Sequence, residues 1–280
     1  ERELGHILRD ACPHIAIVAP EVAQTVFQME GDLGLAKTIV AGSATGRRFD
    51  AWRDDDGAVL PQPLPAPDAW ASLQYTGGTT GLPKGANSTH RQMATNISQC
   101  ETLLPTRPGE ERILCVMPLF HCFAVGTGLH PAAYARSTLV ILPRYHPRDV
   151  IEAIQTHAIT RLPAGPTVFI GLMNYDGFEQ ADLSSLRYCV SGSAPLAAET
   201  LLRWEAATGC PILEGYGQTE AGPVVSFNPY DGTAKPGSVG VALPGTEIDI
   251  VDVDSGTQSL GVGELGEIRV RGPQIMSGYH

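Results

Sequence analysis

The chain has 280 residues and a formal net charge of −11 at neutral pH, and 43% of its residues are hydrophobic. This length allows a substantial core in one large domain or in two smaller ones. The acidic balance argues against a nucleic-acid surface, which needs a basic stripe, but it leaves room for a locally basic ligand site. No apolar run is long enough to span a bilayer, and residues 1–6 lack the apolar stretch of a secretory signal.

The cysteines are scattered, and no two of them form a Cys-x-x-Cys pair. This spacing argues against a zinc site or a disulfide framework. Small buried thiols are typical of a reducing compartment, so we expect a cytoplasmic protein. The six positions are Cys12, Cys100, Cys115, Cys122, Cys189 and Cys210.

The first part of the chain predicts helices over residues 3–10 and 21–30, with strands over 15–19 and 38–40. Three aspartates at 54–56 and the prolines at 61, 63, 65 and 67 then indicate an extended surface loop. We interpret this loop as an excursion within one domain, with a domain boundary as the alternative. It leads into a predicted strand over residues 71–75.

From residue 91 onward, predicted helices and strands alternate. The helices cover 91–104, 147–157, 167–174 and 197–208, and the strands cover 113–117, 139–142, 159–162, 187–190 and 211–213. Such alternation favours parallel strands joined by right-handed crossovers. Residues 247–253 and 267–270 alternate with period two instead, which predicts a small antiparallel sheet or barrel near the C-terminus. The expected fold class is therefore α/β, with largely parallel sheets and flanking helices.

Residues 75–85 read Tyr-Thr-Gly-Gly-Thr-Thr-Gly-Leu-Pro-Lys-Gly and are the most informative segment. Glycines allow a tight backbone near a ligand, and the hydroxyls and Lys84 supply donors and positive charge, which suits a polyphosphate. The nucleoside-triphosphatase P-loop is excluded, because it requires Gly-Lys followed by Ser or Thr, whereas Lys84 follows Pro83 and precedes Gly85. A flexible surface loop is the alternative.

This segment resembles the phosphate loop of the adenylate-forming superfamily, which includes acyl-CoA synthetases, adenylation domains of peptide synthetases and luciferases. Gly77, where that superfamily typically has Ser, resembles the bacterial long-chain fatty-acid–CoA ligases, as does Gln74-Tyr75 before it. Further segments resemble the superfamily in the expected order. They are the acyl-site segment 118–121, the adenine-side loop 191–196, the nucleotide and magnesium segment 214–220, and the segments 266–267 and 271–279 that close the large domain.

The resemblance implies ATP and AMP contacts from Thr76, Gly77, Gly78, Thr79, Thr80, Gly81, Lys84, Gly192, Ser193, Ala194, Pro195, Glu214, Gly215, Tyr216, Gly217, Gln218 and Thr219. It implies acyl contacts from His121, Phe123, Val125, Gly126 and Gly192, and catalytic roles for His121, Thr219 and Glu220. Glu220 would be the Mg²⁺ ligand. The structural alternatives are a solvated carboxylate for Glu220, a buried tyrosine for Tyr216 and a packed core histidine for His121.

Amino-acid-activating relatives place an aspartate where this chain has His121, which favours an acid without an amine. Residues 122–128 are apolar and then small, which favours an alkyl tail at about 0.8 kcal/mol per buried methylene. The implied function is ATP-dependent activation of a medium- or long-chain fatty acid to acyl-AMP and then to acyl-CoA, with ATP, Mg²⁺ and coenzyme A. A fatty-acyl–AMP ligase serving a carrier protein, an aryl or other acid–CoA ligase, and a non-catalytic nucleotide-binding module are the alternatives.

We expect residues 1–240 to be part of the large N-terminal domain of the superfamily and residues 241–280 to be its β-rich subdomain. The superfamily pattern continues beyond His280 with a Thr-Gly-Asp segment, a hinge and a small C-terminal domain that carries a catalytic lysine. These parts are absent from the 280 residues, so we expect the chain alone to be catalytically incomplete. The expected partners are small molecules and not nucleic acid, with peripheral membrane contact and a homodimer left open.

Overall fold

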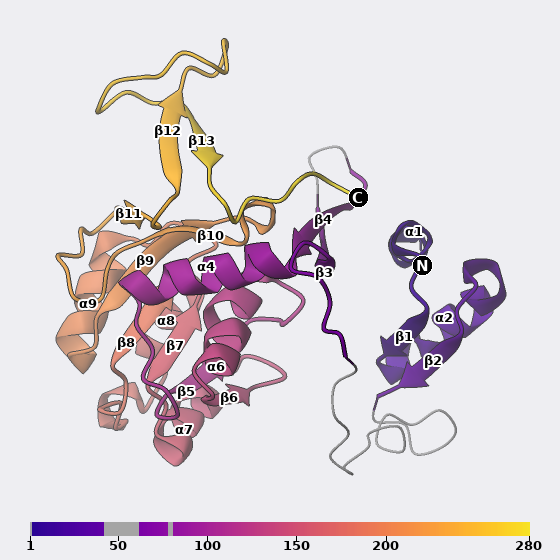
Figure 1. Ribbon diagram of the computed structural model, residues 1–280. Helices are drawn as coiled ribbons and strands as arrows, with labels where there is room; N and C mark the ends of the chain where they lie inside the picture. The colour runs from indigo at the N-terminus through magenta and orange to yellow at the C-terminus, as the bar shows by residue number, and fades with distance from the viewer. Residues whose placement is uncertain (1, 42–61, 78–80) are drawn as a thin grey trace. The chain divides into compact units, whose positions relative to one another are not determined.

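A computed structural model describes residues 2–41, 62–77 and 81–280 (Figure 1). The chain divides into two compact units, one formed by residues 1–90 with Ser277–His280 and the other by Arg91–Met276. In the described residues, no helix is both long and apolar enough to cross a bilayer. The expected division at residue 240 stays a prediction, and most of the proline-rich loop lies outside the described residues.

The smaller unit begins with two helices that alternate with two strands, as expected. They are α1 (Arg2–Ala11), β1 (Ile15–Val18), α2 (Pro20–Leu33) and β2 (Lys37–Val40). The strands pair in parallel. Helix α2 begins with Pro20, whose fixed φ suits the first turn, and ends at Gly34 with φ of 63°. Val26 of α2 and Ile39 of β2 are both buried.

An antiparallel hairpin completes the smaller unit. It consists of the expected strand β3 (Trp70–Thr76) and a strand that the sequence analysis did not predict, β4 (Lys84–Thr89). The last residues of the chain add to it, because Tyr279 bridges Ala86 and the His280 N–H donates to the Gly85 carbonyl at 2.8 Å.

The larger unit is built on a central sheet, in which seven of the described strands have the order β11-β10-β9-β8-β7-β5-β6. The strands from β6 to β9 pair in parallel, and β10 and β11 add an antiparallel edge. The prediction of a largely parallel sheet is confirmed. The bounds are β5 (Arg112–Cys115), β6 (Thr138–Ile141), β7 (Arg161–Ala164), β8 (Tyr188–Ser191), β9 (Ile212–Gly217), β10 (Val224–Phe227) and β11 (Val241–Ala242).

Helices cover both faces of this sheet (Figure 1). On one face, α7 (Pro147–His157), α8 (Pro166–Met173) and α9 (Ala198–Thr208) form the larger core. On the other face, α4 (His90–Leu103) and the short α5 (Cys122–Ala124) form a second core. Alternation along β8 serves both cores, because Cys189 packs in the first and Tyr188 and Val190 pack in the second.

The larger core contains Trp204 of α9, which is fully buried. Its ring centroid lies 5.1 Å from that of Phe169 and 5.8 Å from that of Phe178, within the usual range for aromatic pairs. Phe169 comes from α8 and Phe178 from the short helix η2 (Phe178–Gln180), so this cluster ties three consecutive helices together.

Strand β7 begins two residues later than expected from the apolar run 159–162. Helix α7 ends at Ala158 with a left-handed φ of 47°, and the Ile159 N–H closes back on the Ile154 carbonyl at 3.1 Å. Ile159 therefore finishes the helix instead of starting the strand, and the strand begins at Arg161.

The C-terminal segments with period-two patterns form β12 (Glu247–Val251) and β13 (Glu267–Arg271). They pair antiparallel from Glu247 with Arg271 to Val251 with Glu267. An ion pair of 2.6 Å between Arg269 and Asp249 joins them. The expected antiparallel sheet is confirmed as a two-stranded sheet, and a barrel is not formed in the described residues.

Candidate active site

The predicted phosphate loop is the connection between β3 and β4 in the smaller unit. Thr76 pairs with Lys84, so these two residues fix the ends of the loop. Gly77, Gly81 and Lys84 are exposed, and Gly81 has φ of 87°, which favours glycine. Gly78, Thr79 and Thr80 lie outside the described residues. Because Lys84 opens a strand, its setting differs from that of a P-loop lysine, which belongs to a helix N-terminus.

Both ends of this loop are anchored to the rest of the smaller unit. The Tyr75 hydroxyl donates to the Asp10 carboxylate of α1 at 2.5 Å. Burial is the largest cause that raises the pKa of Tyr75, and this hydrogen bond is the second. The His6 ring lies 3.0 Å from the Pro83 carbonyl. Gly85 leaves no room for a side chain, since a Cβ there would lie 2.8 Å from Cδ1 of Leu73. The hydrogen bonds of Tyr75 and Pro83 were not predictable from local sequence, because they join residues more than sixty positions apart.

In the larger unit, His121 opens the helical segment that follows β5. Its backbone N–H donates to the Pro118 carbonyl at 2.9 Å, and its Nδ1 accepts the Phe123 N–H at 3.1 Å as the N-cap of α5. The neutral ring then carries its proton on Nε2. The His121 side chain is exposed, so the packed-core alternative for this residue is wrong. A histidine with its Nε2 proton facing outward can donate to an anionic oxygen.

The acyl-site segment contacts the adenine-side loop through Phe123 and Gly192. A Cβ at Gly192 would lie 2.6 Å from Cε2 of the Phe123 ring, so only glycine fits under this ring. Gly192 directly follows β8. The next residue, Ser193, adopts a left-handed φ of 68°, a conformation that glycine would adopt at less cost. Ser193, Ala194 and Pro195 are exposed, and buried Leu196 anchors the end of the loop.

The same acyl-site segment also contacts the nucleotide and magnesium segment. The side chains of Cys122 and Thr219 form a hydrogen bond. Burial raises the pKa of the Cys122 thiol, the Glu220 carboxylate raises it further, and the bond to Thr219 opposes this shift. Cys122 therefore remains a neutral thiol near neutral pH. It directly follows His121, and it interacts with Thr219 through a hydrogen bond and with Glu220 through the charge of the carboxylate.

Strand β9 extends into the nucleotide segment, beyond the strand expected over residues 211–213, so the expected end of that strand was wrong. Residues Glu214–Gly217 belong to β9, because β10 pairs with them on the side opposite β8, with Phe227 opposite Gly215. The side chain of Glu214 is buried, and it accepts the Gly237 N–H at 3.2 Å. Tyr216 is half-buried. Any role of the Glu214 carboxylate toward a nucleotide stays a prediction.

Beyond β9 the chain turns sharply to present Thr219 and Glu220. A Cβ at Gly217 would overlap the Pro223 carbonyl, which accepts the Gln218 N–H at 2.9 Å. Thr219 and Glu220 then lie in the short helix η3 (Thr219–Ala221). The Glu220 carbonyl accepts the Met276 N–H at 3.1 Å. The turn is thus held from both sides of the loop.

Polar side chains of α4 support this turn, and the sequence analysis did not single them out. Asn96 is buried, and its amide exchanges two hydrogen bonds with the backbone of Val224, at 2.9 and 3.2 Å. Gln99 donates to the buried Gln274 at 3.2 Å. An Asn and a Gln in a helix are ordinary surface residues by sequence, so no sequence signal could have revealed this support.

As a metal site, the described residues offer one predicted ligand, Glu220. No group of three or more His, Cys, Asp and Glu side chains in them could hold a metal ion. A single carboxylate fits Mg²⁺, which keeps several waters and commonly takes phosphate oxygens as further ligands. It does not fit a structural zinc site, which needs four protein ligands.

The larger unit thus brings His121, Phe123, Gly192, Thr219 and Glu220 into one connected set at the carboxyl ends of parallel strands. This edge is where open α/β sheets bind ligands. The phosphate-loop residues belong to the smaller unit.

Comparison with known proteins identifies the family. The sequence profile of the AMP-binding enzyme family matches residues 1–280, and the chain belongs to that family. It is 38% identical over 210 residues to a long-chain-fatty-acid–CoA ligase of Bacillus subtilis (strain 168), covering 75% of this chain and 37% of the relative. It is 36% identical over 239 residues to 4-coumarate–CoA ligase 2 of Oryza sativa subsp. japonica, covering 82% and 42%.

The fold agrees with solved structures of similar proteins. ATP-bound MatB from Rhodopseudomonas palustris matches with a TM-score of 0.86 at 29% identity, covering 99% of this chain and 54% of that one. The chain spans 37% and 42% of the lengths of the two curated relatives.

Proposed function

We propose that the chain carries the nucleotide- and acid-binding part of an ATP-dependent acid–thiol ligase. In this proposal a fatty acid of medium or long chain length attacks the α-phosphorus of ATP to give acyl-AMP and pyrophosphate. The thiol of coenzyme A then displaces AMP to give acyl-CoA. The family membership and the two acid–CoA ligases among the relatives support this class of reaction.

One structural observation supports the assignment of this reaction to the candidate site. Phe123 packs on Gly192, and Cys122 bonds to Thr219, so three segments with separate predicted ligands meet at one edge of the sheet. The carboxylate substrate is already ionised near neutral pH, so the reaction needs positioning and charge stabilisation more than it needs a base.

The chain's own residues would divide these tasks. His121, with its Nε2 proton, would donate to the acyl carboxylate, and Thr219 would donate to the α-phosphate. Thr76 and Lys84 of the β3–β4 loop would hold the other phosphates, and Ser193 to Pro195 with Tyr216 would line the adenine. Glu220 would hold Mg²⁺, which when bound neutralises phosphate charge.

The kind of acid is supported by the residues that follow His121 in the sequence. Val125 and Gly126 follow the His121–Phe123 segment, and neither carries a charge that could pair with a substrate amine. The fatty-acid relative at 38% identity supports an alkyl chain, and the 4-coumarate relative at 36% supports an aryl acid as the second candidate.

Binding measurements can test this proposal on the chain itself. Palmitoyl sulfamoyl adenosine is a stable mimic of palmitoyl-AMP, and its acetyl, 4-coumaroyl and leucyl counterparts serve as controls. We expect the palmitoyl mimic to bind most tightly by isothermal titration calorimetry. Preference for the acetyl or leucyl mimic would refute the fatty-acid assignment, and preference for the coumaroyl mimic would favour the aryl candidate. Absence of binding by every mimic would refute the proposed acyl-AMP site.

The acceptor and the compartment are further parts of the proposal. Coenzyme A is the proposed acceptor, and a comparison of coenzyme A with a loaded carrier protein distinguishes it from the carrier-protein alternative. All six cysteines are free thiols, which supports a reducing compartment such as the cytoplasm.

A further inference from the structure

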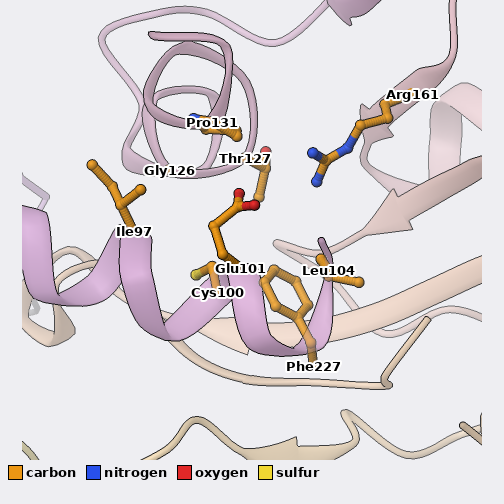
Figure 2. Close-up of a pocket in the computed structure, with 9 residues that line it drawn as sticks. All are labelled: Ile97, Cys100, Glu101, Leu104, Gly126, Thr127, Pro131, Arg161 and Phe227. Carbon is orange, nitrogen blue, oxygen red and sulfur yellow. The ribbon is translucent and has the colours of Figure 1, made fainter. Parts of the chain in front are cut away.

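A small cavity lies on the α4 face of the central sheet, between α4, the π-helical turn η1 (Val125–Leu129), α6 (His130–Tyr134), β7 and β10 (Figure 2). Most of its lining is apolar, with Ile97, Leu104 and Phe227 among the walls. Its volume is about 10 Å³, on the scale where a water molecule needs about 10–15 Å³. It therefore has room for one small polar group.

Arg161 reaches this cavity from β7. Leu162 and Ala164 of the same strand pack in the core of the opposite face, so the strand alternation turns Arg161 toward α4. The residue is 3% exposed, and among the described residues its Nε and Nη1 have no hydrogen-bond partner. Its guanidinium stacks on Tyr188, with Cζ 4.7 Å from the ring centroid. Stacking alone does not offset the cost of burying an unpaired charge.

Glu101 enters the cavity from α4, and Figure 2 shows its carboxylate pointing toward Thr127 and the Arg161 guanidinium. Its Oε2 already accepts the Thr106 N–H at 2.8 Å and the Thr106 hydroxyl at 2.7 Å. Thr127 donates its hydroxyl to the Phe123 carbonyl at 2.7 Å, which leaves the lone pairs of its oxygen to accept. The cavity thus carries one cation and one anion that do not form an ion pair with each other in the described residues.

The thiol of Cys100, which also lines the cavity, lies close to both charges. Burial raises the pKa of Cys100 to about 12, the Glu101 carboxylate adds to the shift, and Arg161 opposes it. The Glu101 carboxylate and the Arg161 guanidinium are therefore both close enough to the Cys100 thiol to affect its pKa.

These contacts determine which kind of ligand group would suit the cavity. A carboxylate or phosphate would pair with Arg161 but would also face the Glu101 carboxylate. A methyl group would leave the guanidinium unpaired. A hydroxyl group can accept from Arg161 and donate to Glu101 or Thr127, and it fits the volume.

The cavity and the proposed acid site share one helical segment. Gly126 and Thr127, which line it, follow His121 in a helical segment that is continuous from Cys122 to Tyr134. Thr127 lies six residues after His121, a span of about 9 Å at the α-helical rise, which is within reach of a medium-length acyl chain that starts at His121. Resting on the function proposed above, we propose that this cavity is the polar end of the acyl-binding site and receives a hydroxyl group on the acyl chain. The substrate is then a hydroxy fatty acid, and Arg161 determines its specificity.

The test uses pairs of sulfamoyl adenosine mimics that differ by one hydroxyl, such as decanoyl and ω-hydroxydecanoyl, with octanoyl and dodecanoyl pairs to locate the best length. We expect the hydroxylated mimic to bind wild-type protein about tenfold more tightly at one chain length, as a bond to a charged group implies. Arg161→Met should abolish this preference and leave the affinity for the unsubstituted mimic within about twofold.

Arg148→Met is the matched control, because Arg148 is exposed and pairs with Asp149, and it should retain the preference. Glu101→Gln is a second variant that keeps the shape of the side chain, and it should reduce the preference if Arg161→Met fails to fold. Equal affinity for both members of every pair, in a protein that binds them, overturns the hydroxyl assignment and leaves the acyl-AMP site intact, so that a water fills the cavity. If no mimic binds, the proposed function fails and this inference fails with it.

Discussion

The ring of Phe123 lies over the backbone of Gly192, so closely that a Cβ on residue 192 would stand 2.6 Å from Cε2 of the ring. Phe123 follows the capped His121, and Gly192 follows strand β8, so one contact fixes the spacing of the acyl and adenine segments. Glycine has no side-chain entropy to lose in such a contact.

Substitution of Gly192 tests this contact. Gly192→Ala should displace the Phe123 ring and lower the affinity for palmitoyl sulfamoyl adenosine by about tenfold, or about 1.4 kcal/mol. Gly31→Ala in α2 is the control, because a Cβ there meets nothing within 4 Å. This control should keep its affinity for the mimic and gain about 0.5–1 kcal/mol of stability. Unchanged binding by Gly192→Ala would show that the ring is free to move.

His121 combines a helix-capping role with its proposed contact to the acid, and two variants separate them. Asn is also a good N-cap, so His121→Asn should keep the melting temperature while lowering affinity for the mimic. His121→Ala should lose the cap as well, at a cost of about 0.5–2 kcal/mol. If the Asn variant binds the mimic as tightly as the wild type does, the imidazole has no part in the site.

Glu220 is proposed to act through Mg²⁺, so its effect should depend on the ion. In wild-type protein, Mg²⁺ should raise the affinity for ATP, as measured by calorimetry with and without the metal. Glu220→Gln should remove most of this increase and leave metal-free ATP binding nearly unchanged. Glu199, an exposed carboxylate of the first turn of α9, gives the control Glu199→Gln, for which the Mg²⁺ effect should persist.

Burial of the Cys100 thiol predicts a loss of stability at alkaline pH. Its pKa rises from 9.0 in the unfolded chain to about 12 in the folded protein, so the unfolded state releases this proton first. The stabilisation is complete below pH 9.0 and is lost as the pH rises to about 12, at up to about 1.4 kcal/mol per pH unit. Urea unfolding at several pH values should show a shallower decline for Cys100→Ala than for the wild type. Parallel declines would mean that the thiol is solvated.

The parts of the fold that were predictable are those with a local signal. Pro147 and Gly209 bound helices that the structure contains, and the period-two pattern from Glu247 to Val251 forms β12. Strand β4 was missed because Lys84–Thr89 is polar and lacks the apolar alternation of a half-buried strand, although it pairs with β3 in a hairpin.

The site was predictable as a set of segments, but the contacts within it were not. The motifs named His121, Gly192 and Thr219 from their neighbours in sequence. Nothing local reveals that Cys122 would bond to Thr219, or that Arg161 would turn inward at the start of β7. The strand that contains Arg161 was expected at 159–162. It begins at Arg161 instead, because α7 ends with the left-handed residue Ala158.

The aromatic cluster around Trp204 gives the larger unit an optical probe of its own. Trp204 is fully buried in that unit, whereas Trp70 of the smaller unit is 59% exposed. With Trp52 replaced by phenylalanine, each unit would keep one indole, the first emitting at short wavelength and shielded from iodide, the second emitting at longer wavelength and quenched by it. The melting of each unit could then be followed separately in one sample, which would reveal whether a nucleotide stabilises one unit or both.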